Sequence, residues 1–86
     1  MNENEEEVRK KIIEILRKYA RNHALLEKAT AKTRIIGDLN VSSARFIDVI
    51  LTFEDVFKIE IGDDEINQVA TIGEAAALIQ RKLAKG

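Results

Sequence analysis

Apolar residues in the first part of the chain recur at helical spacing. From Glu5 to about Asn22 they fall at Val8, Ile12, Ile15, Leu16 and Tyr19. This is the 3.6-residue period of an amphipathic helix. Three glutamates stand before the stripe and basic side chains stand near its end, an order that complements the helix dipole. The pattern predicts a helix over residues 5–22.

Residues 23–41 show no clean period. Their apolar side chains are spaced too loosely for one helix: Leu25, Leu26, Ile35, Ile36 and Leu39. Gly37, Asp38 and Asn40 are turn-forming residues. We predict a long first loop, held to the core by its apolar residues and with room for one helical turn. Loops of this length are uncommon in small domains and are often functional.

The helical signal returns from Ser42 to Phe57. One apolar stripe is formed by Phe46, Ile50, Phe53 and Phe57, and it is widened by Ile47, Val49 and Val56. Asp48, Thr52 and Asp55 fall on the opposite face, which we expect to be exposed to solvent. Either Ser42 or Ser43 suits the N-cap of this second helix.

The last third combines a short alternating stretch with two more helical signals. Residues 57–61 alternate like a strand, but no convincing partner strand exists, so we expect an extended connection with its isoleucines facing the core. Asp63 opens a short helix. Thr71 and Glu74 form a capping box, which starts a final helix with the stripe Ile72, Ala76, Ile79 and Leu83. The fold class is therefore all-α: a small bundle of three main helices plus one short helix, with a long first loop, in a single domain over residues 1–86.

Composition agrees with one small soluble domain. The chain has 86 residues, of which 45% are hydrophobic and 34% charged, the balance of a globular protein. Because only 5% are aromatic, aliphatic side chains must supply most of the core. The apolar runs are too short to span a bilayer, and the acidic N-terminus is unlike a signal peptide. We expect a cytoplasmic monomer with no membrane partner.

The small net charge of −1 conceals a strong segregation of charge. Residues 1–34 carry nine basic and six acidic side chains, whereas residues 35–80 carry two basic and nine acidic ones. The acidic middle of the chain suits basic protein partners. It argues against nucleic acid as a partner, because the second helix displays acids where a recognition helix needs arginines.

Groups that could support catalysis are scarce. The chain has no cysteine, which excludes disulfides, thiolate metal sites and a cysteine nucleophile. His23 is the single histidine and has no triad partner at a suitable spacing. The run Asp63-Asp64-Glu65 is too short for a calcium loop and fits an acidic helix start better. We expect no metal site and no autonomous enzyme.

Three blocks of the chain resemble the acyl carrier proteins and their aminoacyl- and peptidyl-carrier relatives. The stretch "IIGDLNVSSARF" is similar to the D-L-G-x-D-S-L-type motif of these carriers. The stretch "LTFEDVFKIEIGDDEI" is similar to their L-E-x-x-F-x-I-x-I-P-D-type segment, and "VATIGEAAALI" to the T-V-G-D-A-type residues that open the last helix. The blocks occur in the family's order and spacing, and the resemblance covers about residues 8–83.

The resemblance implies a non-catalytic carrier. Ser43 takes the place of the serine that a phosphopantetheinyl transferase modifies with 4′-phosphopantetheine, and Ser42 is then a helix cap. The arm would hold acyl groups as thioesters and deliver them to synthases or transferases with basic docking patches. Four residues are expected to meet these partners: Arg45, Asp48, Glu54 and Asp55. Six are expected to line the interior, or a pocket that receives the acyl chain: Phe46, Ile50, Phe53, Ile61, Ile72 and Ile79.

The central motif departs from the family pattern. Ser42 stands where an aspartate is usual, Ala44 where a leucine is usual, and Arg45 where an acidic residue is common. The resemblance implies a carrier in fatty-acid, polyketide or related lipid or secondary-metabolite biosynthesis. With the basic first helix, these departures favour a specialised discrete carrier of a secondary-metabolite, polyketide or lipid-modification pathway over the housekeeping carrier of fatty-acid synthesis. Two alternatives remain: an aminoacyl or peptidyl carrier, and a carrier-like interaction subunit that is never modified.

Overall fold

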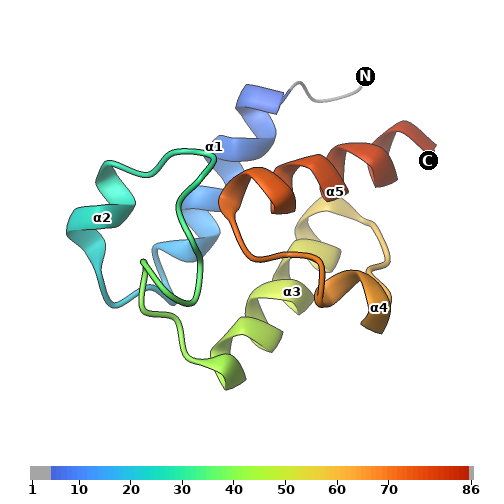
Figure 1. The fold of residues 1–86 in the computed structure, drawn as a ribbon. Coiled ribbons are helices and arrows are strands. Elements are labelled where there is room, and N and C mark those ends of the chain that lie inside the picture. The colour runs from blue at the N-terminus through green and yellow to red at the C-terminus, as the bar shows by residue number, and fades with distance from the viewer. Residues whose placement is uncertain (1–4, 86) are drawn as a thin grey trace.

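The computed structural model describes residues 5–85, which form five helices (Figure 1). They are α1 (Glu5–Leu16), α2 (His23–Glu27), α3 (Ser43–Phe57), α4 (Asp63–Ile66) and α5 (Ile72–Lys85). Pairing of β type within these residues is limited to one isolated bridge between Arg34 and Thr71. None of the described helices is long and apolar enough to cross a membrane. The predicted all-α fold is confirmed.

The first helix is shorter than the apolar period predicted. It ends at Leu16 rather than near Asn22, and the next residues form a tight turn in which the Tyr19 N–H donates to the Leu16 carbonyl at 2.9 Å. The N–H groups of Arg21 and Asn22 both donate to the Leu39 carbonyl at 3.1 Å. The chain leaves its helical path because the first loop provides this one acceptor, the Leu39 carbonyl, to both N–H groups.

The first loop contains a complete short helix, α2. The side chain of Asn22 caps it by accepting from the Leu25 N–H at 3.1 Å, and Leu26 is buried in the core. Five residues are too few to show a helical period. The prediction of a long loop that holds one helical turn is therefore confirmed. Counted as a helix, α2 brings the number in the described residues to five, where four were predicted.

The helices enclose one aliphatic core. Helix α1 packs against α5 and α3, an arrangement visible in Figure 1. Val8, Ile12 and Leu16 on α1 are fully buried. The six predicted interior residues are all buried and belong to the same cluster: Phe46, Ile50, Phe53, Ile61, Ile72 and Ile79. The stripe on α3 is narrower than predicted, because Ile47 and Val56 lie at its margins and are exposed while Val49 is buried.

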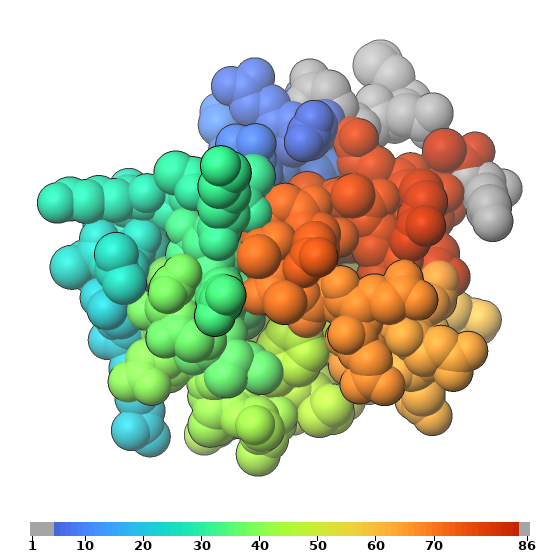
Figure 2. Space-filling model, viewed as in Figure 1, coloured from blue at the N-terminus to red at the C-terminus, as the bar shows by residue number. Residues whose placement is uncertain are grey.

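The first loop is tied to the start of α5. The Ile35 N–H donates to the Ala70 carbonyl at 3.0 Å, and the Ile72 N–H donates to the Thr33 carbonyl at 3.0 Å. Figure 2 shows the two segments in contact across the visible face of the molecule. The long loop is thus fixed by backbone hydrogen bonds as well as by its buried side chains.

Candidate functional site

The adjacent serines at the start of α3 have different roles. Ser42 is the N-cap: its backbone is extended, with φ −67° and ψ 157°, and its Oγ accepts from the Arg45 N–H at 3.2 Å. Its carbonyl accepts from the Phe46 N–H at 2.8 Å. This hydroxyl is therefore used within the fold, as predicted for a cap.

Ser43 is the first residue of α3 and is exposed. Its hydroxyl makes no hydrogen bond to any residue in the range 5–85. Val41 and Phe46 are buried on either side of it, whereas residues 42–45 are all exposed. The tertiary structure thus presents the Ser43 hydroxyl on a well-anchored helix start and leaves it available to another molecule.

A basic surface pocket adjoins this helix start. It has a volume of about 350 Å³ and is lined by residues from the turn after α1 and from the start of α3: Lys18, Tyr19, Ala20, Arg21, Ser42 and Arg45. We call it the cationic pocket. Arg45 lies beside Ser43 in the sequence, but Lys18 and Arg21 could not be assigned to this site from the sequence because they are more than twenty positions away along the chain. Only the turn after α1 brings them here.

The predicted docking residues differ in exposure. Asp55 is exposed, as expected. The Asp48 side chain is 49% exposed and pairs with Arg45 three residues earlier, at 3.6 Å between Nη1 and Oδ2. Glu54 is partly buried, and its Oε2 accepts from the Ile61 N–H at 2.8 Å. As docking residues all three acids were expected to be exposed, but only Asp55 is; Asp48 and Glu54 are partly buried, Glu54 because its carboxylate holds the connection that follows α3.

The outward surface of α3 also carries apolar side chains. Ile47 is 47% exposed and Leu51 is 56% exposed, one turn apart. With Arg45, Asp48 and Asp55 they form what we call the outer face of α3. Such a mixture of apolar and charged side chains is typical of a transient protein interface.

An ion pair joins α4 to α5 away from the serines. Glu65 Oε1 contacts Lys82 Nζ at 2.7 Å and accepts from the Gly62 N–H at 2.9 Å. The hydrogen bond from Lys82, and next that from Gly62, lower the pKa of Glu65 below its ordinary value. Of the three acids at the start of α4, Glu65 therefore serves local structure, in agreement with the capping role predicted for this run.

Candidate catalytic and metal-binding groups are not assembled elsewhere in the described chain. His23 is exposed at the start of α2. Among residues 5–85, no group of three or more histidine and acidic side chains is placed to hold a metal ion. The start of α3 is the place where an exposed nucleophilic hydroxyl lies beside an organised charged surface.

The known proteins that are similar to this chain in sequence and in structure are acyl carrier proteins. No family model matches the chain. The acyl carrier protein of Phenylobacterium zucineum is 37% identical over 74 residues, which cover 84% of this chain and 94% of that protein. The acyl carrier protein of Caulobacter vibrioides is 37% identical over 75 residues, covering 85% and 96%. The solved structure of the acyl carrier protein from Enterococcus faecalis superimposes with a TM-score of 0.75 at 30% identity, covering 95% of this chain and 99% of that one.

Proposed function

Since this chain belongs to the acyl carrier protein family, we propose that it carries acyl intermediates as thioesters on a 4′-phosphopantetheine arm attached to Ser43. A carrier role follows from the family, and acyl carrier proteins generally use this prosthetic group. The observation that supports Ser43 as the attachment point is that the two adjacent serine hydroxyls at the start of α3 differ in their hydrogen bonding. The Ser42 hydroxyl is occupied as a cap, whereas the Ser43 hydroxyl is exposed and unbonded among residues 5–85.

The chemistry requires a second protein. Ser43 Oγ attacks the phosphorus of coenzyme A that bears the pantetheine, forming a phosphodiester and releasing adenosine 3′,5′-bisphosphate. The hydroxyl proton passes to a base of the phosphopantetheinyl transferase. The carrier contributes an accessible nucleophile on a rigid helix, and the arm contributes the thiol that a chain without cysteine lacks. Synthases and acyl-transferring enzymes would then act on the thioester.

Two serine variants test this assignment. Incubation with coenzyme A and a promiscuous phosphopantetheinyl transferase should add the mass of one arm to the wild-type protein. Ser43→Ala should stay unmodified and keep its stability, because its hydroxyl has no role among the described residues. Ser42→Ala should be modified but should lose about 0.5–2 kcal/mol of unfolding free energy, the usual effect of removing an N-cap.

The opposite pattern would overturn the assignment. If Ser42→Ala abolished the mass increase while Ser43→Ala kept it, the attachment point would be Ser42. If the wild-type protein stayed unmodified with several transferases, the chain would be a carrier-like interaction subunit. Intact mass spectrometry and urea denaturation of the same samples separate these outcomes.

We also propose that the outer face of α3 docks partner enzymes, with Arg45, Asp48 and Asp55 setting the preference and Glu54 contributing only its exposed portion. Arg45 neutralises Asp48 by pairing with it, which weakens attraction to a basic docking patch. This favours a dedicated partner in a specialised fatty-acid, polyketide or related pathway over one built for a uniformly acidic carrier.

The docking proposal predicts a dependence on charge and ionic strength. With a transferase that has a basic docking patch, Arg45→Asp should accelerate modification and Asp55→Lys should slow it, because rim charges act mainly on the association rate. Raising the salt concentration should reduce both effects. Modification rates that were equal for all three proteins and independent of salt would exclude this face as the docking surface.

A further inference from the structure

The cationic pocket is a site that the carrier role by itself does not require. Three of its six lining side chains are positively charged: Lys18, Arg21 and Arg45. We propose that this pocket binds the phosphodiester of the protein's own arm and so holds the first part of the arm against the turn after α1. The proposal rests on modification of Ser43.

The walls of the pocket are firmly connected to each other. The N–H groups of Arg21 and Asn22 donate to the carbonyl of Leu39, three residues before Ser42. The Tyr19 hydroxyl lies 3.1 Å from Thr52 Oγ1, which itself donates to the Asp48 carbonyl at 2.8 Å. Because the single hydroxyl proton of Thr52 is already donated to the Asp48 carbonyl, the Tyr19 hydroxyl must be the donor in this pair. The turn after α1 is thus fixed to both the approach to α3 and the middle of α3.

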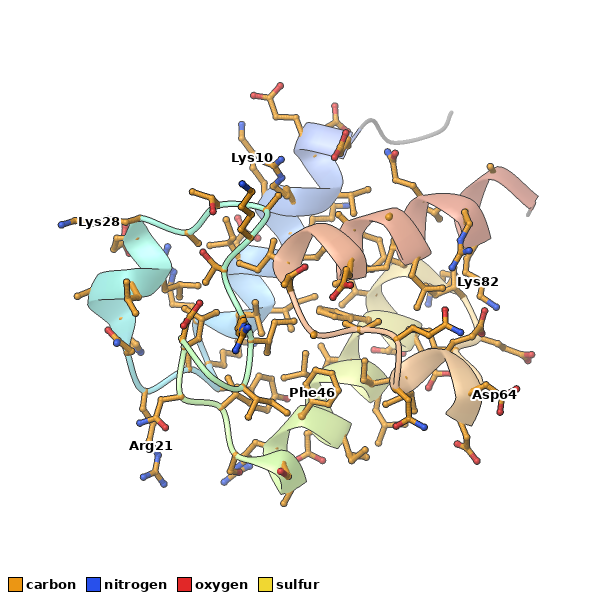
Figure 3. The ribbon with its side chains drawn as sticks, viewed as in Figure 1. Lys10, Arg21, Lys28, Phe46, Asp64 and Lys82 are labelled. Atoms are coloured by element: carbon orange, nitrogen blue, oxygen red, sulfur yellow. The ribbon has the colours of Figure 1, made fainter. Side chains whose placement is uncertain are left out.

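The pocket's cations are available to an anion. Lys18 and Arg21 are exposed, and neither makes an ion pair with residues 5–85. Figure 3 shows Arg21 at the end of the molecule where α3 begins, with its side chain extending away from the ribbon. Arg45 has one partner, Asp48, at the long distance of 3.6 Å, and its side chain is 65% exposed. Arginine in particular matches phosphate oxygens with paired N–H donors.

The geometry favours the tethered phosphate over a free one. Ser42 lines the pocket, and Ser43 is its neighbour in the chain, with a Cα separation of about 3.8 Å. A phosphodiester on Ser43 therefore starts within one residue of the pocket. Exposed cations bind a dilute anion weakly in salt, but a short tether supplies an effective concentration of the order of millimolar. The occupant we assign is thus the arm itself.

Backbone and arginine side-chain N–H resonances of the unmodified and modified protein test the assignment. Intact mass first confirms that one arm is present, so failure of modification is recognised separately from failure of this proposal. In the modified protein we expect shifts at residues 18–21 and at the Arg45 guanidinium, as well as beside Ser43. These distant shifts should disappear near an ionic strength of about 1 M, where the Debye length falls to about 3 Å.

Charge-neutral variants provide the matched controls. Arg21→Gln and Lys18→Gln should each lose most of the arm-dependent shift at the remaining pocket residues while still being modified. Lys28→Gln removes an exposed cation that does not line the pocket and should leave the shifts unchanged. Shifts confined to residues next to Ser43, or shifts unaffected by Arg21→Gln, would overturn the proposal. A response of the unmodified protein to free coenzyme A, with no change on modification, would overturn it too and assign the pocket to the incoming substrate.

Discussion

Replacing Gly73 by alanine is the most direct test of how the first loop is held. Gly73 lies in the first turn of α5, and its N–H donates to the Ala31 carbonyl at 2.8 Å. A Cβ at this position would lie 2.8 Å from that carbonyl oxygen and 2.9 Å from the Ala31 Cβ. Because neither atom can rotate away, the loop and α5 must separate. The hydrogen bond from Ile72 to Thr33 would be strained as they do so.

The expected change in unfolding free energy for Gly73→Ala is the difference between two opposing effects. Forcing an extra carbon into a closely packed position costs about 1–3 kcal/mol. Alanine is better than glycine within a helix by up to about 1 kcal/mol, but a first-turn position gains only part of that. We therefore expect Gly73→Ala to lower the unfolding free energy by about 1–2 kcal/mol. For a domain of this size, each kcal/mol corresponds to a fall in Tm of about 4–8 °C.

Urea and thermal denaturation followed by circular dichroism measure this change, with Gly37→Ala as the matched control. A Cβ on Gly37 meets only the Arg34 side chain at ordinary contact distance, 3.5 Å, and the backbone has no positive φ there. That variant should be neutral or gain about 0.4–1 kcal/mol by restricting the unfolded chain. Equal midpoints for the two variants, or a Gly73→Ala protein as stable as wild type, would refute the close contact between α5 and Ala31.

Two further stability predictions concern the core and the α4–α5 ion pair. Phe53 is 1% exposed and packs edge-to-face on Phe57 at 6.3 Å, so Phe53→Ala should cost about 3–5 kcal/mol. Leu51→Ala, on the same helix but 56% exposed, should stay within about 0.5 kcal/mol, and similar losses for both would contradict the orientation of α3. The pKa of Glu65 is lowered in the folded protein by Lys82 and Gly62, so its contribution is present above the ordinary pKa of 4.5 and is lost as pH falls through the lower folded value. Wild type should therefore be more stable than Glu65→Gln at neutral pH, and the gap between their urea midpoints should close in acid; a gap independent of pH would contradict the ion pair.

The sequence was sufficient for the features that depend on local periodicity. The apolar stripes of α1, α3 and α5 identified three helices and the buried positions among them, because a long amphipathic helix repeats its signal over several turns. The capping box at Thr71 was equally readable: the Glu74 N–H donates to Thr71 Oγ1 at 3.1 Å, and Glu74 accepts from the Thr71 N–H at 3.0 Å. These interactions span three residues, so no distant part of the chain has to be known.

The features that the sequence left undecided depend on distant segments or on backbone angles. Helix α1 ends early because a carbonyl of the later loop accepts from Arg21, and Glu54 is partly withdrawn from solvent because it binds the Ile61 N–H. Either serine could have capped α3, and the extended backbone at Ser42 decided between them.

The proposed attachment serine and the cationic pocket show the same contrast between local and tertiary information. The motif around Ser43 could be read in sequence because its residues are consecutive. The pocket could not, because Lys18 and Arg21 reach Ser42 only when the turn after α1 is bonded to the first loop. Helical periods and caps depend on neighbouring residues, whereas a charged surface formed by the turn after α1 and the start of α3 exists only once the core has brought these segments together.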